Sequence, residues 1–125
     1  MTGELLASIE RAVLEWEGVF KKRDEDVPSG TGVTGYRYGR SRRDPTKAGP
    51  QIGHVHDDGH ADFSFPKEVW GALIESGRAT PHPAFPDSRT TVSHEIRTPE
   101  DVPRTLELFR MNYERLKESA RTRLE

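Results

Sequence analysis

The chain lacks cysteine altogether. Disulfide bonds and metal sites built on thiolates are therefore excluded. Long apolar runs are missing too: none approaches the roughly 20 residues that cross a bilayer, and the first residues lack the apolar segment of a signal peptide. We therefore expect a cytoplasmic protein that does not enter a membrane.

Apolar residues are scarce as a whole, since 32% of the 125 residues are hydrophobic and the mean hydropathy is −0.82. This length suits one domain with a modest core, which we expect to span residues 1–125. The net charge is −2 and the isoelectric point about 6.2. Nucleic acid is therefore not an expected partner, because proteins that bind it carry a basic surface. The composition does not set the oligomeric state.

The first half of the chain contains a helical pattern, a strand and a loop. Apolar residues at helical spacing predict an amphipathic helix over residues 4–20, and a charged segment follows over residues 21–26. We expect a short strand over residues 33–38. Residues 39–50 are rich in arginine, glycine and proline, which indicates a flexible loop.

Residues 51–65 carry the alternating pattern of a β-hairpin, and its turn decides which side chains share a face. Asp57-Asp58-Gly59 fits a three-residue loop that ends in a left-handed residue, a conformation that glycine adopts without strain. This register pairs His56 with His60 and His54 with Asp62. It leaves an apolar face of Val55, Ala61, Phe63 and Phe65. A two-residue turn at Asp58-Gly59 is the alternative, and it would place His54 and His56 on the phenylalanine side.

Helical and extended patterns alternate after the hairpin. Pro66 suits the first turn of a short helix that ends at Gly77, and three prolines make residues 79–88 extended or irregular. A strand is expected over residues 90–96.

A capping threonine, Thr98, then opens a last helix whose end, residues 118–125, is expected to fray. The order of elements predicts an α+β fold: a small, mostly antiparallel sheet of three to five strands with a central β-hairpin, packed by N-terminal, middle and C-terminal helices.

A known family has the same motifs. Residues 53–59, Gly-His-Val-His-Asp-Asp-Gly, together with the following Asp62 and Phe65-Pro66, resemble the luciferase-like domain family of unknown function. The resemblance covers about residues 30–117. The family occurs in bacterial and archaeal single-domain proteins and in fungal proteins, among them a luciferase that oxidises a hydroxypyrone luciferin with molecular oxygen. The resemblance implies a protein of unassigned role whose family-pattern positions are His54, His56, Asp62 and His82.

The histidines of the hairpin allow two kinds of chemistry. His54 and His56 could chelate one ion such as zinc or iron(II), with Asp62 or His60 as a third ligand. The alternative is a solvated polar face with a cross-strand pair of His54 and Asp62. We favour the alternative, and therefore expect no metal and no cofactor. In that case His54 or His56 acts as a base, Asp62 orients it, and His82 is a second proton carrier.

The expected ligand is a small molecule on the open, His-rich face of the sheet. We expect His60 at the rim of this site, Phe85 along its wall, and Arg37 or Arg40 over an anionic ligand. Such a site could support acid/base or oxygen chemistry, although the sequence does not show that the protein is an enzyme. The competing hypothesis is a non-catalytic module that binds another protein through the open face and the Arg-rich loop, which also contains Arg42 and Arg43.

Overall fold

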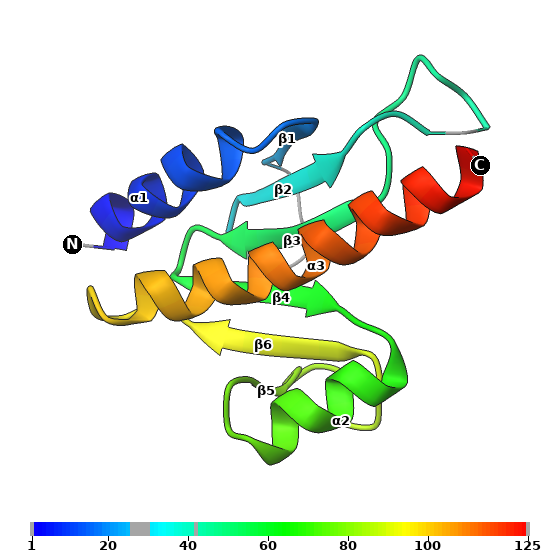
Figure 1. Ribbon diagram of the computed structural model, residues 1–125. Helices are drawn as coiled ribbons and strands as arrows, with labels where there is room; N and C mark the ends of the chain where they lie inside the picture. The colour runs from blue at the N-terminus through cyan, green and yellow to red at the C-terminus, as the bar shows by residue number, and fades with distance from the viewer. Residues whose placement is uncertain (1, 26–30, 42, 125) are drawn as a thin grey trace.

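The computed structural model describes residues 2–25, 31–41 and 43–124, which form one sheet and three helices (Figure 1). The helices are α1 (Thr2–Leu14), α2 (Lys67–Glu75) and α3 (Asp101–Leu124). The strands are β1 (Val19–Asp24), β2 (Val33–Tyr38), β3 (Gln51–His56), β4 (His60–Ser64), β5 (Thr80–Pro81) and β6 (Thr91–Glu95). All neighbouring strands are antiparallel, in the order β1-β2-β3-β4-β6-β5. The predicted α+β class is confirmed, with six strands where three to five were expected.

The helices cover one face of the sheet. Helix α3 runs across β2, β3 and β4, α1 lies beside α3 and β1, and α2 packs at the β6–β5 edge (Figure 1). The core between these helices and the sheet includes Ile9, Phe63, Leu73, Phe109 and Tyr113. The opposite face of the sheet carries no helix of the described chain, so polar side chains on that face can meet a ligand.

Helix α3 is attached to the sheet by a buried amide as well as by its apolar stripe. Asn112 is fully buried, and its Nδ2 donates to the carbonyl oxygens of Ile52 at 2.7 Å and Ser64 at 3.1 Å. These carbonyls lie at the start of β3 and the end of β4. Because buried polar groups are costly when unpaired, Asn112 fixes both strands of the hairpin against the helix.

Asp101, the first residue of α3, stabilises the turn that leads into the helix, and the hydroxyl of Thr98, the expected cap, donates to its carboxylate at 3.3 Å. The Asp101 carboxylate accepts hydrogen bonds from the backbone amides of Arg97 at 2.8 Å and Thr98 at 2.9 Å. These bonds lower the pKa of Asp101. The helix continues to Leu124, and the fraying expected beyond residue 117 stays a prediction.

The prediction for the N-terminal segment was wrong in extent. Helix α1 ends at Leu14, and the residues expected to form a charged exit form the edge strand β1. The chain reverses direction at Gly18, whose φ of 83° lies in the left-handed region that glycine adopts without strain. The apolar residues that continue the helical spacing beyond Leu14 are therefore not in a helix. Phe20 therefore lies on β1 with 44% of its surface exposed. Asp26 lies outside the described residues.

The loop between β2 and β3 has local order. Arg40 and Ala48 form an isolated antiparallel bridge. The flexibility expected of residues 39–50 stays a prediction, and Arg42 lies outside the described residues. Among the residues that the structure describes, no helix has both the length and the apolar character needed to cross a membrane.

Candidate functional site

The hairpin of β3 and β4 has the predicted three-residue turn. His56 lies opposite His60, and His54 lies opposite Asp62. Gly59 has a φ of 99°, and its amide donates to the His56 carbonyl at 3.0 Å. Because this register is fixed, the polar residues of both strands point away from the helices. The two-residue turn that was weighed against it is therefore excluded.

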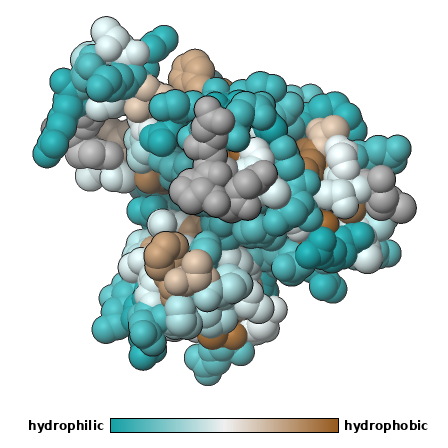
Figure 2. Space-filling model, turned by 180° about the vertical axis from the view of Figure 1, so that it is seen from behind, coloured by the Kyte–Doolittle hydropathy of each residue, from teal (hydrophilic) through white to brown (hydrophobic). Residues whose placement is uncertain are grey.

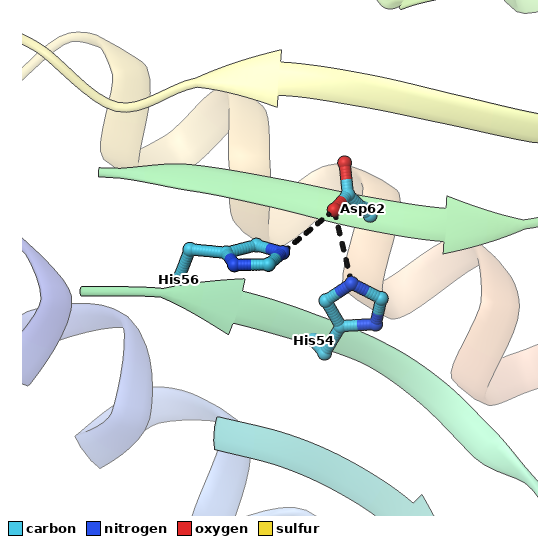
Figure 3. Close-up of side chains that lie close together, drawn as sticks. All are labelled: His54, His56 and Asp62. Carbon is cyan, nitrogen blue, oxygen red and sulfur yellow. Dashed lines mark hydrogen bonds and ion pairs between the residues drawn. The ribbon is translucent and has the colours of Figure 1, made fainter. Parts of the chain in front are cut away.

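Four imidazoles converge on one carboxylate oxygen. The Nε2 atoms of His54 and His56 lie 2.9 Å and 3.0 Å from Oδ2 of Asp62 (Figure 3). The Nε2 atoms of His82 and His60 lie 3.4 Å and 3.5 Å from the same oxygen. His82 therefore reaches the face of the hairpin histidines from a segment that is distant in the sequence. These five side chains are called the Asp62 cluster below.

Asp62 is the buried centre of this cluster, with 1% of its side chain exposed. Its Oδ1 accepts a short hydrogen bond from the hydroxyl of Ser93 on β6. Burial acts to raise the pKa of Asp62, but hydrogen bonds from His54 and Ser93 and the nearby imidazoles outweigh it, and the pKa falls below its usual range. Asp62 is therefore an anion at neutral pH.

The outer ring nitrogens of three histidines have their own partners. His60 Nδ1 lies 2.7 Å from a carboxylate oxygen of Asp58, and His54 Nδ1 lies 2.8 Å from the amide oxygen of Gln51. His82 Nδ1 instead accepts a hydrogen bond from the backbone amide of Ala84 at 3.0 Å. These partners set the orientation of each ring and the nitrogen that carries its proton.

His56 is the most enclosed of the histidines in the cluster. Its ring stacks on that of His60 with centroids 4.1 Å apart, and its Nδ1 is buried without a hydrogen-bond partner among the described residues. Burial, followed by the neighbouring His60, lowers the pKa of His56. His56 is therefore neutral at physiological pH and can act as a base or as a ligand.

The other predicted ligand-binding residues lie at different distances from this cluster. The ring of Phe85 is 60% exposed and lies 5.0 Å from that of His82, so Phe85 is beside the site. Arg37 lines a cavity of about 170 Å³ together with Gln51, the partner of His54, but no residue of the Asp62 cluster lines this cavity, and Arg37 Nη1 donates to the carbonyl oxygen of Gly49 at 3.1 Å. Arg40 lies over the ring of Phe20 instead, at 5.6 Å from its centroid.

The largest of the cavities described here lies away from the Asp62 cluster. A cavity of about 660 Å³ lies between the Arg-rich loop and the C-terminal part of α3, and Arg37, Arg40, Arg43 and Leu116 are among its lining residues. The Asp62 cluster lies elsewhere, on the face of the sheet that the helices leave free. Seen from that side, the molecule is mainly hydrophilic (Figure 2).

Sequence reasoning missed several members of the site. Ser93 lies on the polar face of β6, but only the pairing of β6 with β4 brings it to Asp62. Asp58 and Gln51 were predicted only as turn and strand residues. Arg23 was assigned to a charged exit, yet its guanidinium binds both carboxylate oxygens of Asp57, at 2.7 Å and 2.5 Å, and so holds the hairpin turn.

His94, the remaining histidine, lies on the opposite face of the sheet. Its Nδ1 is 2.9 Å from the hydroxyl of Thr105 on α3. Val92 and Ile96, both of which are buried, lie on the same side of the strand. His94 is therefore a matched control for the histidines of the Asp62 cluster.

Fold and site together define an α+β domain in which helices cover one face of an antiparallel sheet and a histidine–aspartate cluster lies on the other face. Comparison with family models identifies a luciferase domain over residues 49–112, just over half of the chain. The chain belongs to this family, and the resemblance inferred from its motifs is confirmed. No curated protein and no solved structure matches the chain. The matched region contains β3, β4, β6 and every member of the Asp62 cluster.

Proposed function

We propose that the Asp62 cluster is the binding site of a small molecule and that its imidazoles carry acid/base chemistry. The observation that supports this most strongly is the convergence of four Nε2 atoms on the buried Asp62 carboxylate. Burying a carboxylate costs folding free energy even when several donors surround it, so a sheet face without a function has little reason to contain one. Ionisable groups with shifted pKa values are also concentrated at functional sites.

The proposed roles follow from burial and from the outer partners. His56, with its lowered pKa, is available as a base at neutral pH, and His54 is the alternative base. Asp62 holds both rings in place. His82 carries its proton on Nε2 because its Nδ1 accepts from a backbone amide, so His82 can donate a proton or a hydrogen bond.

The surroundings favour a planar ligand with an acidic group. Phe85 presents an exposed ring beside His82, and an aromatic ring of a ligand can stack on it. The cluster offers the protonated Nε2 of His82 as a donor to an acidic group. A carboxylate or phenolate next to an aromatic ring would satisfy both features.

A fragment screen tests this proposal directly. Aromatic carboxylates and phenols are added to metal-free protein in EDTA, and binding is followed by ligand-observed NMR. Binding should be lost in the double variant His54→Ala/His56→Ala and retained in His94→Gln. Binding that is unchanged in the double variant would remove this face from consideration.

Failure of every fragment to bind would favour the alternative function, a module that binds another protein. The exposed Phe20 and the arginine over it, Arg40, belong to the surface that such a module would use. In that case substitution of Arg40 or of His54 would weaken partner binding, and His94→Gln, on the opposite face, would leave it unchanged.

A further inference from the structure

When its imidazoles are neutral, the Asp62 cluster has too few protons to make a hydrogen bond at every contact between a ring nitrogen and an oxygen. A neutral imidazole carries one proton. His60 faces the Asp58 carboxylate with Nδ1 and Asp62 with Nε2, and His54 faces the Gln51 oxygen with Nδ1 and Asp62 with Nε2. Each of these neutral rings therefore has one proton for two acceptors, and a ring that is protonated on Nδ1 directs the lone pair of its Nε2 at the Asp62 carboxylate.

Lone pairs on nitrogen and a carboxylate oxygen repel each other unless a cation lies among them. A proton can fill this role for one pair at a time, when an imidazole becomes doubly protonated. A metal ion fills it for several donors at once and leaves the imidazoles neutral.

The separations fit the coordination of a transition metal. Zinc lies about 2.0–2.2 Å from nitrogen and oxygen ligands, so neighbouring donors lie about 2.9–3.4 Å apart in octahedral to tetrahedral sites. The Nε2 atoms of His54 and His56 are 2.9 Å and 3.0 Å from Asp62 Oδ2, and the three donor atoms lie within 4.8 Å of one another.

We infer that His54, His56 and Asp62 bind one divalent transition-metal ion of the zinc type. Two nitrogen donors disfavour magnesium and calcium, which prefer oxygen ligands. Three protein ligands leave at least one coordination position for water or for a ligand, as in catalytic rather than structural sites. His60 stacks on His56 and can supply a third nitrogen as a fourth ligand.

Three further contacts match what metal ligands require. The Gln51 oxygen orients His54, the Asp58 carboxylate orients His60, and the Ser93 hydroxyl holds the second oxygen of Asp62. His82 is different, because its Nδ1 accepts a hydrogen bond and its Nε2 is protonated. His82 therefore lies beside the ion as a hydrogen-bond donor and is not one of its ligands.

This inference uses the site of the proposed function but goes beyond it, and it reverses the metal-free expectation drawn from the sequence. Sequence spacing left a solvated His–Asp pair as the simpler interpretation. The structure adds burial of Asp62 and a third and fourth imidazole around it. If the ion is bound, His54 and His56 act as ligands, and His82 remains the proton carrier.

Isothermal titration calorimetry with Zn²⁺ and EDTA-stripped full-length protein tests the site without any organic ligand. We expect one ion per chain with a Kd of about 1 μM or tighter, and no binding of Mg²⁺ or Ca²⁺. His54→Gln, His56→Gln and Asp62→Asn should each weaken binding about 100-fold or more, since substitutions even at outer partners cost 10–100-fold. His94→Gln, on the opposite face, should bind as the parent does.

The variants distinguish a site formed by these three ligands from a different set of ligands and from adventitious binding. His82→Gln should keep its affinity within about tenfold, and loss of binding in this variant would overturn the assignment of the three ligands. Zinc binding that survives in His54→Gln and His56→Gln would mean an adventitious ion only, and absence of binding in the parent would refute the site. Circular dichroism of each variant confirms that it is folded. Because the fragment screen is run in EDTA, it can fail or succeed independently of this titration.

Discussion

The substitution Asp62→Asn separates a metal site from a structural polar cluster. Asparagine has the shape of aspartate, and its carbonyl oxygen can still accept from the Ser93 hydroxyl. Its amide can donate to the Nε2 lone pairs of His54 and His60, which a carboxylate cannot do. We therefore expect the metal-free variant to lose no more than about 1 kcal/mol of unfolding free energy.

Zinc should then stabilise the parent protein and not the variant. An ion that binds only the folded state at 100 times its Kd adds about 2.7 kcal/mol. For a chain of 125 residues, 1 kcal/mol shifts the melting temperature by about 3–5 °C, so the expected rise in the parent is about 10 °C. The Asp62→Asn melting temperature should change by less than about 2 °C under the same conditions.

Thermal unfolding followed by circular dichroism measures both effects, in EDTA and then with Zn²⁺. His94→Gln is the control and should show the full rise. The reasoning is refuted if zinc raises the melting temperature of Asp62→Asn as much as that of the parent. It is also refuted if the metal-free variant loses several kcal/mol, because the carboxylate would then be needed by the fold itself.

Three further predictions concern the support of the site. Gly59→Ala should cost about 1–2 kcal/mol in denaturant unfolding and weaken zinc binding, because its φ is 99° and a Cβ would lie 3.0 Å from the Ile96 carbonyl oxygen; an unchanged midpoint would argue against the turn. Asn112→Ala should cost about 2–4 kcal/mol, since it leaves two strand carbonyls unpaired, and a loss below about 1 kcal/mol would show that water replaces the amide. Asp101→Ala should cost about 1 kcal/mol at pH 7. The amides of Arg97 and Thr98 lower the pKa of Asp101, so its contribution is present above the unfolded pKa of about 3.9 and is lost as the pH falls through the lower folded value; a difference between parent and variant that persists at about pH 2 would contradict this.

The hairpin register could be predicted because local chemistry determines it. Asp57-Asp58-Gly59 allows one favourable three-residue loop, and the alternation of Ala61, Phe63 and Phe65 agrees with it. When turn and periodicity agree, each side chain has a defined face. The faces of His54 and Asp62 therefore followed from the sequence alone.

The rest of the site depends on contacts that are distant in the sequence. Ser93 reaches Asp62 only because β6 pairs with β4, and no local pattern sets that order of strands. Strand β1 was missed for a related reason. Its sequence is mostly charged, as an edge strand allows, and its first residues continue the apolar spacing of the preceding helix, so they were assigned to that helix. The arrangement of donors around Asp62, on which the metal inference depends, could not be read from residue spacing.

The central claim is that His54 and His56 present unprotonated Nε2 atoms to an ion held on Asp62. Long-range ¹H–¹⁵N NMR of the histidine rings measures the proton and metal state of each nitrogen, without and with one equivalent of Zn²⁺. We predict Nδ1–H tautomers with zinc-shifted Nε2 signals for His54 and His56, a retained Nε2–H for His82, and no change for His94. Equal responses of His54 and His94 to zinc, or none from either His54 or His56, would contradict the account.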